Sequence, residues 1–141
     1  MNNWRIKSIV LAILLLASIQ ADAQTRKQLF DAGWKFHKGE LSEQAGKSDF
    51  DDSTWRVVNL PHDWSIEGVP AKNEPSGNDG GYRPTGKGWY RKVITLSKQD
   101  FNKDGKIAKR WSLYFEGVYN RSEVYLNGQL LGKRPNGYIS F

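Results

Sequence analysis

The chain has 141 residues and a formal net charge of +6, and its basic residues are scattered along its length. No basic run is longer than two residues, as at Lys109-Arg110 and Lys133-Arg134. This pattern excludes the clustered charge of a nucleic-acid-binding protein, so we expect no nucleic-acid partner. Cysteine is absent, which excludes a disulfide framework, a cysteine nucleophile and a thiolate metal site.

The N-terminus has the pattern of a secretory signal peptide. Arg5 and Lys7 precede an apolar run over 8–19, and Ala21-Asp22-Ala23 is a small-residue cleavage site. We therefore predict a signal peptide at 1–23 and one mature domain at 24–141. No cysteine follows the site for lipid attachment, and no other segment could cross a membrane. An exported protein, periplasmic or extracellular, with no membrane partner after cleavage is expected.

Short apolar or alternating segments separated by turn residues predict a chain made of β-strands. The expected strands lie at 29–37, 55–60, 89–96, 110–117, 124–126, 129–131 and 138–141. Asn127-Gly128 predicts a two-residue hairpin turn, because both of its positions need positive φ. That turn would pair Tyr125 with Leu130 and Val124 with Leu131. The pattern is typical of an all-β antiparallel β-sandwich.

A long stretch at 66–88 is rich in Gly, Pro, Asn and Asp and has no helical period. Its last part, from Asn78, leads directly into the aromatic strand that begins at Trp89. Such a loop can hold a binding surface on a rigid scaffold, or it can be a tight connection between strands. The pattern leaves both alternatives open.

The residues offer little support for catalysis within this chain. His37 and His62 have no nucleophile elbow beside them and no carboxylate at metal-ligand spacing. The sequence from Asp100 to Gly105 resembles the start of a calcium loop, but its twelfth position is Trp111 rather than Glu. A polar turn is the better interpretation, and we expect no cofactor and no metal. The candidate carboxylates provide no acid–base pair; they are Asp63, Glu67, Glu74, Asp79 and Glu116.

Five segments in one order carry a family resemblance. They are LPHDWSIE (60–67), GKGWYRK (86–92), FEGV (115–118), VYLNG (124–128) and GYISF (137–141). Together they resemble the N-terminal sugar-binding domain of glycoside hydrolase family 2, and most of all that of exported bacterial β-galactosidases. The resemblance covers about 29–141.

The resemblance implies a jelly-roll-like β-sandwich, similar to galactose-binding domains and incomplete at its C-terminus. In this family an immunoglobulin-like domain and a (β/α)8 barrel follow, and the barrel carries the two catalytic glutamates. No catalytic residue is therefore expected here. Asn73-Glu74 matches the family's Asn before the acid/base, but it lies in a Gly/Pro-rich loop, and the role is not carried over.

The resemblance also implies that loops of this domain wall the sugar pocket, which nominates Asp63, Trp64 and Arg83 as substrate-binding residues. Asp63 could accept hydroxyl hydrogen bonds while the indole of Trp64 stacks on the sugar. The alternative for Asp63 is a turn carboxylate bound to neighbouring backbone N–H groups. Arg83 stands where some relatives have Asn, and it could meet a charged or branched sugar. A further acidic sugar contact is expected beyond Phe141.

We expect the chain to be a piece of a retaining glycosidase that hydrolyses terminal β-galactosides, with carbohydrate as its partner and no activity by itself. A β-glucuronidase or β-mannosidase would have the same first domain. An alternative from a different class is a free-standing secreted carbohydrate-binding module.

Overall fold

The computed structural model describes residues 27–108 and 110–141 of the chain. The signal peptide predicted at 1–23 lies outside the described residues. All described strands belong to one unit, Asp31–Phe141. The described part contains strands, three short 3₁₀ turns and no α-helix, so it is all-β, as predicted. No described helix is long and apolar enough to cross a membrane.

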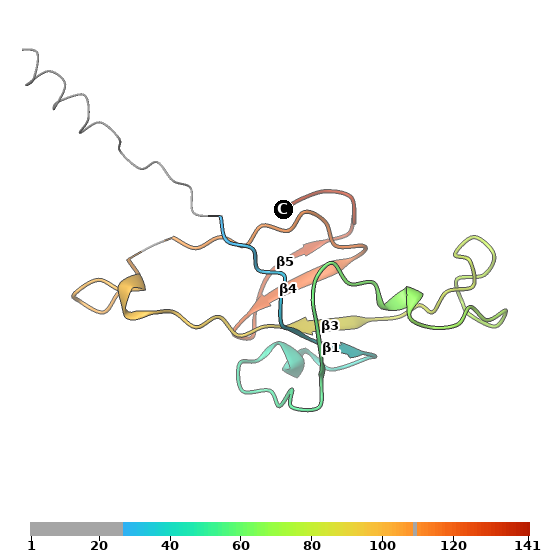
Figure 1. The fold of residues 1–141 in the computed structure, drawn as a ribbon, viewed down its shortest axis with the longest axis horizontal. Helices are drawn as coiled ribbons and strands as arrows, with labels where there is room; N and C mark the ends of the chain where they lie inside the picture. The colour runs from blue at the N-terminus through green and yellow to red at the C-terminus, as the bar shows by residue number, and fades with distance from the viewer. Residues whose placement is uncertain (1–26, 109) are drawn as a thin grey trace, which may run out of the picture. The chain divides into compact units, whose positions relative to one another are not determined.

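Three of the strands form one antiparallel sheet with the order β2-β1-β3 (Figure 1). Its strands are β1 (Trp34–Lys38), β2 (Arg56–Val58) and β3 (Gly88–Arg91). Phe36 pairs with Arg56 on one side and with Tyr90 on the other. Because Phe36 is on the central strand, its side chain is only 5% exposed, and it packs against the rings of His62 and Tyr90. Phe36, Ala45 and Trp55 are the buried residues of a small core.

The predicted hairpin forms a second antiparallel sheet of β4 (Ser122–Leu126) and β5 (Gln129–Arg134). Asn127 and Gly128 have φ values of 50° and 84°, as a two-residue turn of this type requires. Tyr125 pairs with Leu130 as predicted. The predicted partner of Val124 is wrong, because a β-bulge after Val124 shifts the register and places Gly132 opposite it.

The hairpin packs onto the first sheet through Tyr125. Its ring lies 6.3 Å from that of Trp89, centroid to centroid. A Cβ at Gly46 would be 3.1 Å from the same tyrosine ring, so Gly46 allows this close approach. Gly46 ends the 3₁₀ turn η1 (Glu43–Gly46), which also accepts a hydrogen bond from Arg91 of β3 at the carbonyl of Ala45, so η1 contacts both sheets.

Two of the predicted strands are absent, and those predicted at 29–37, 55–60 and 89–96 are shorter than predicted. β3 ends at Arg91, so 92–96 form no ladder, and 110–117 and 138–141 are irregular. Phe115 and Phe141 do exchange two backbone hydrogen bonds, of 2.8 and 3.0 Å, but the pairing extends no further. An alternating apolar pattern shows that a segment can be a strand, yet a ladder also needs a neighbouring strand. The described residues provide none for these segments.

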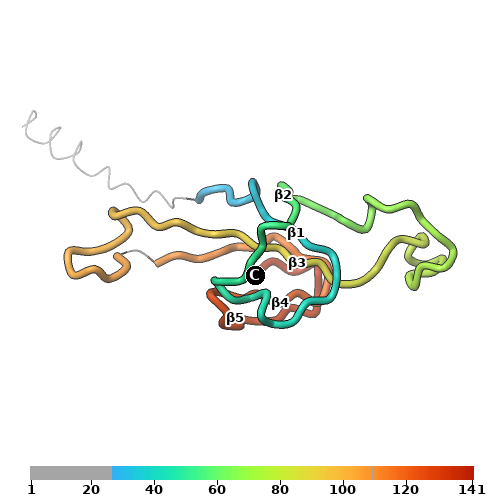
Figure 2. Tube along the Cα trace, turned by 90° about the horizontal axis from the view of Figure 1, so that it is seen from below, coloured from blue at the N-terminus to red at the C-terminus, as the bar shows by residue number. Residues whose placement is uncertain are grey.

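Two long loops extend away from the three-stranded sheet (Figure 2). One is the glycine-rich stretch after the 3₁₀ turn η2 (Trp64–Ile66). The other runs out from β3 to η3 (Lys98–Asp100) and turns back at Gly105, with Phe101 bridged to Ile107. Gly105 has a φ of 77°, which confirms the predicted polar turn at this tip.

Candidate functional site

The turn that contains Asp63 and Trp64 is held at both ends by hydrogen bonds between side chains. At its start, His62 Nδ1 is 2.7 Å from the hydroxyl of Tyr90 on β3. At its end, Glu67 bonds His62 Nε2 at 3.0 Å and Arg56 of β2 at 2.6 Å. The Arg56 and His62 hydrogen bonds lower the pKa of Glu67 to about 2, so it stays ionised and acts only as an acceptor. Because an ionised carboxylate can only accept, the Nε2 of His62 donates to Glu67.

Tyr90 stays protonated in this network. Burial, with the nearby charges of Asp63 and Glu67, raises the pKa of Tyr90 to about 12. The edge of the His62 ring also packs against Phe36, with ring centroids 4.8 Å apart. The network therefore fixes the turn to two strands of the sheet and to its core.

Asp63 caps the turn η2. One carboxylate oxygen accepts hydrogen bonds from the backbone N–H of Ser65 at 2.9 Å and from its hydroxyl at 2.6 Å. This is the turn role that the sequence left open for Asp63. No hydrogen bond of its other oxygen is found within the described residues, so that oxygen could still accept from a ligand.

Trp64 and Arg83 lie near opposite ends of the same turn. Trp64 packs over Gly88, and the ammonium of Lys38 lies 4.7 Å from a ring centroid of the indole, so a cation already covers part of its surface. Pro84 packs against Gly68, which brings the neighbouring Arg83 close to the turn's end. Among the described residues no ion pair of Arg83 is found, and no direct contact joins it to Asp63 or Trp64.

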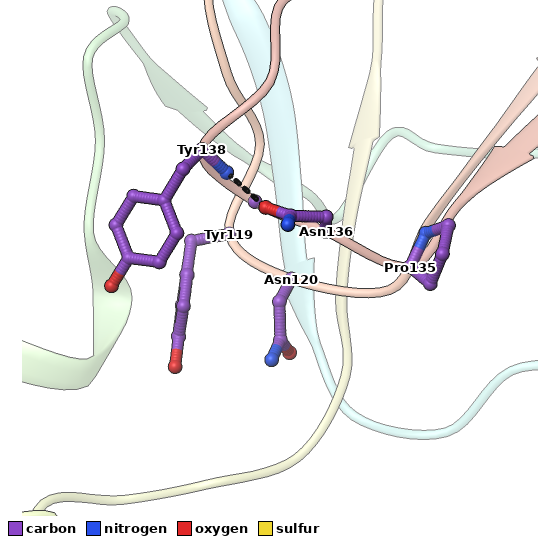
Figure 3. Close-up of a pocket in the computed structure, with 6 residues that line it drawn as sticks. Tyr119, Asn120, Pro135, Asn136 and Tyr138 are labelled. Atoms are coloured by element: carbon purple, nitrogen blue, oxygen red, sulfur yellow. Dashed lines mark hydrogen bonds between the residues drawn. The ribbon is translucent and has the colours of Figure 1, made fainter.

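A second candidate site lies at the open end of the β4–β5 hairpin (Figure 3). We call it the tyrosine pocket; its volume is about 340 Å³, and its lining residues are Tyr119, Asn120, Pro135, Asn136, Gly137 and Tyr138. The rings of Tyr119 and Tyr138 are 5.5 Å apart, centroid to centroid, and inclined by 58°. They are 74% and 84% exposed, so both rings are accessible to a ligand.

Local backbone geometry builds the tyrosine pocket. A Cβ at Gly137 would be 2.6 Å from the Cα of Tyr119, so only glycine lets the two segments approach this closely. The backbone N–H of Tyr138 donates to Asn136 Oδ1 at 2.8 Å and orients that amide. The Asn136 NH₂ group is left as a donor, and the Asn120 amide lies beside the Tyr119 ring (Figure 3).

The sequence did not single out the tyrosine pocket, because 119–120 and 135–137 looked like connections around the hairpin and Tyr138 was assigned to a strand. The available signal was a Tyr and an Asn at each end of one predicted hairpin. The hairpin brings its two ends together, so these four side chains had to become neighbours.

Four carboxylates of the described part have pKa values shifted from the ordinary range. The pKa shifts found for Asp and Glu within the described residues are all downward, and each involves a hydrogen bond to the carboxylate. They concern Asp51, Asp52, Glu67 and Glu123. A general acid needs the opposite shift, so these groups bind cations or N–H and O–H groups rather than deliver protons. No group of three or more His, Asp or Glu in the described part could hold a metal ion.

Several known proteins are similar to this chain in sequence. It is 50% identical over 112 residues to a β-galactosidase of Bacteroides ovatus, covering 79% of this chain and 12% of that protein. It is 40% identical over 142 residues to a protein of Formosa agariphila provisionally named a β-glucuronidase, covering 99% of this chain and 13% of the relative. The chain thus spans only about an eighth of the length of these relatives. No protein-family model matches it.

Solved structures share its fold. A β-glycosidase from Bacteroides vulgatus matches with a TM-score of 0.68 and 44% identity, over 79% of this chain and 14% of that one. A glycosyl hydrolase family 2 member from Bacteroides cellulosilyticus matches with a TM-score of 0.62 and 32% identity, over 81% of this chain and 15% of that one. Both the sequence and the fold therefore correspond to a small part of much larger glycosidases.

Proposed function

We propose that this chain is a small N-terminal part of an enzyme of glycoside hydrolase family 2. In this proposal the enzyme hydrolyses terminal β-galactosides, and the chain helps to bind the sugar. The relationship to the B. ovatus β-galactosidase favours this substrate. The tyrosine pocket is the observation in the structure that carries the binding role.

The tyrosine pocket has the chemistry of a saccharide site. Aromatic faces pack against the C–H faces of a pyranose, and amide groups donate to and accept from its hydroxyls. Tyr119 and Tyr138 provide two inclined faces, and Asn120 and Asn136 provide the amides. In this proposal Asp63, Trp64 and Arg83 form a second part of the same sugar-binding wall.

The proposed enzyme retains anomeric configuration and places its two catalytic glutamates in a barrel outside this chain. The residues described here bind and orient the sugar, and the chemistry happens elsewhere in the polypeptide. We further propose that the complete domain is a jelly-roll-like β-sandwich followed by an immunoglobulin-like domain. Export to the periplasm or the cell exterior of a bacterium, directed by the signal peptide, completes the proposal.

A β-glucuronidase is the second candidate, because the F. agariphila relative is provisionally named as one. Arg83 carries no ion pair in the described part of the chain and could meet a uronic acid carboxylate. The two candidates share the tyrosine pocket and differ in the charge of the sugar that it receives.

The test uses the full-length polypeptide and p-nitrophenyl β-galactoside, β-glucuronide and β-mannoside. We expect the galactoside to have the highest kcat/KM. Replacing a pocket ring, as in Tyr119→Ala or Tyr138→Ala, should raise its KM roughly fivefold, because a lost aromatic contact costs on the order of 1 kcal/mol. Tyr114→Ala, at an exposed tyrosine outside the pocket, is the matched control.

Two results would contradict the proposal. Hydrolysis by the 141-residue chain alone would show that the chemistry lies within it. Sugar binding without hydrolysis by the full-length polypeptide would favour the alternative of a carbohydrate-binding module.

A further inference from the structure

A second pocket adjoins the tyrosine pocket, and its lining is basic. We call it the cationic pocket; its volume is about 370 Å³, and its lining residues are Arg121, Ser122, Glu123, Lys133, Arg134 and Pro135. Pro135 lines both pockets, and Arg121 directly follows Asn120 of the tyrosine pocket. A ligand in the tyrosine pocket therefore has the cationic pocket beside it.

The charges of the cationic pocket are only partly neutralised. Lys133 is paired with Glu123 at 2.5 Å. The same carboxylate also accepts a hydrogen bond from the Tyr125 hydroxyl at 2.6 Å, so each of its two oxygens already has a partner. Arg121 and Arg134 have no ion pair within the described residues, and the Arg134 guanidinium lies 5.3 Å from the centroid of the Phe141 ring. Two guanidinium groups therefore remain to attract an anion.

A buried hydroxyl in the same lining also lacks a partner. Ser122 Oγ is buried and makes no hydrogen bond among the described residues. A buried polar atom without a partner is rare in proteins and calls for an explanation. An oxyanion held between the two arginines could accept a hydrogen bond from this hydroxyl after a rotation of the side chain.

We propose that the cationic pocket binds an anionic oxygen group, a carboxylate or a sulfate ester, on the saccharide whose ring lies between Tyr119 and Tyr138. Guanidinium groups suit this role because their planar fork matches the oxygens of such anions, often through two hydrogen bonds. The inference rests on the proposed sugar-binding function of the tyrosine pocket and adds that the natural glycan is charged. A neutral sugar would leave two arginines and a buried hydroxyl without partners.

The experiment measures binding by calorimetry with the full-length polypeptide. Its probes are methyl β-galactopyranoside, its 6-sulfate, methyl β-glucuronide and inorganic sulfate. We expect at least one charged glycoside to bind roughly tenfold more tightly than the neutral one, with an affinity that falls as salt is raised. Arg121→Gln should remove that preference and leave the affinity for the neutral galactoside unchanged. Arg110→Gln, at an exposed arginine elsewhere in the chain, is the matched control.

The charged probes separate the two possible anions, because a preference for the 6-sulfate indicates a sulfate ester and a preference for the glucuronide indicates a carboxylate. Arg134→Gln and Arg121→Lys provide further variants if Arg121→Gln does not fold. Equal affinity for neutral and charged glycosides, unaffected by these substitutions, would overturn the inference and leave the proposed function intact. Arginine-dependent binding of inorganic sulfate without any binding of the neutral galactoside would instead count against the sugar pocket while supporting an anion site.

Discussion

Gly88 is the residue at which the turn carrying Asp63 and Trp64 meets the sheet. A Cβ at this position would be 2.7 Å from the indole nitrogen of Trp64 and 3.0 Å from the ring of Phe36. Both groups are large, and Phe36 belongs to the small core. Glycine is therefore required here for lack of space.

We predict that Gly88→Ala destabilises the protein by about 1–3 kcal/mol, the usual cost of forcing an extra carbon into a packed site. The displaced indole should also weaken sugar binding if Trp64 contacts the ligand. Gly132→Ala is the control, because it adds the same methyl group to a strand glycine with no atom within 4 Å. Denaturant unfolding of both variants in the full-length polypeptide measures the difference, and equal stabilities would contradict the prediction.

At the scale of elements, the network through Glu67 connects β2, β3 and the turn between them. Arg56 of β2 and His62 of the turn bond the same carboxylate, and His62 in turn bonds Tyr90 of β3. An exposed ion pair alone contributes little, but this one orients an imidazole that lies against the core. The connection therefore helps to hold the turn in place.

The stabilisation from Glu67 should depend on pH in a defined direction. Its pKa falls from an ordinary 4.5 to about 2 in the folded protein. A lowered pKa stabilises the fold fully above the unfolded value, and this contribution is lost as the pH falls from 4.5 towards 2. We predict that Glu67→Gln lowers Tm near pH 7, and that the difference from the natural chain shrinks across this window. Asp49→Asn, at an exposed carboxylate, should show no such change, and a constant difference down to pH 2 would refute the network.

The elements also show how far the sequence predicts the structure. Asn127-Gly128 requires positive φ at two adjacent positions, so local chemistry alone was enough to place the hairpin. The register beyond Tyr125 depends on a bulge, and no residue near Val124 indicated it. The strands expected at 110–117 and 138–141 failed for another reason, since a strand is defined by a partner that may lie far away in sequence.

The candidate site also has one part that the local sequence predicts and another that depends on contacts between distant residues. The resemblance nominated Asp63 because of its neighbours in the chain, and the structure adds its bonds to Ser65. The tyrosine pocket depends on contacts between the two ends of a hairpin and on the tight approach at Gly137. Sequence periodicity does not report such contacts. The predicted hairpin, however, already implied that the two tyrosines at its ends would be neighbours.

For the whole molecule, the core is small for the length of the chain. Among the described residues only Phe36, Ala45, Trp55 and Pro84 are both apolar and buried. Large apolar side chains elsewhere are exposed, including Val93, Trp111 and Leu131. Burial of apolar surface is the main favourable term in folding, and a chain that leaves so much exposed gains little from it.

We therefore predict that the 141-residue chain by itself unfolds without a sharp cooperative transition and binds a hydrophobic dye at neutral pH. Its partly formed sheets would keep a far-UV circular dichroism signal, while its exposed aromatic rings would give a weak near-UV signal. Within the full-length polypeptide, these apolar side chains should become covered, and the same residues should melt cooperatively.

Limited proteolysis followed by mass spectrometry compares the two forms. Cleavage between 92 and 118 should be fast in the isolated chain and slow in the full-length protein. A single cooperative calorimetric transition of the isolated chain above about 45 °C, in the range of ordinary domains, would show that the small core is sufficient and would contradict this account.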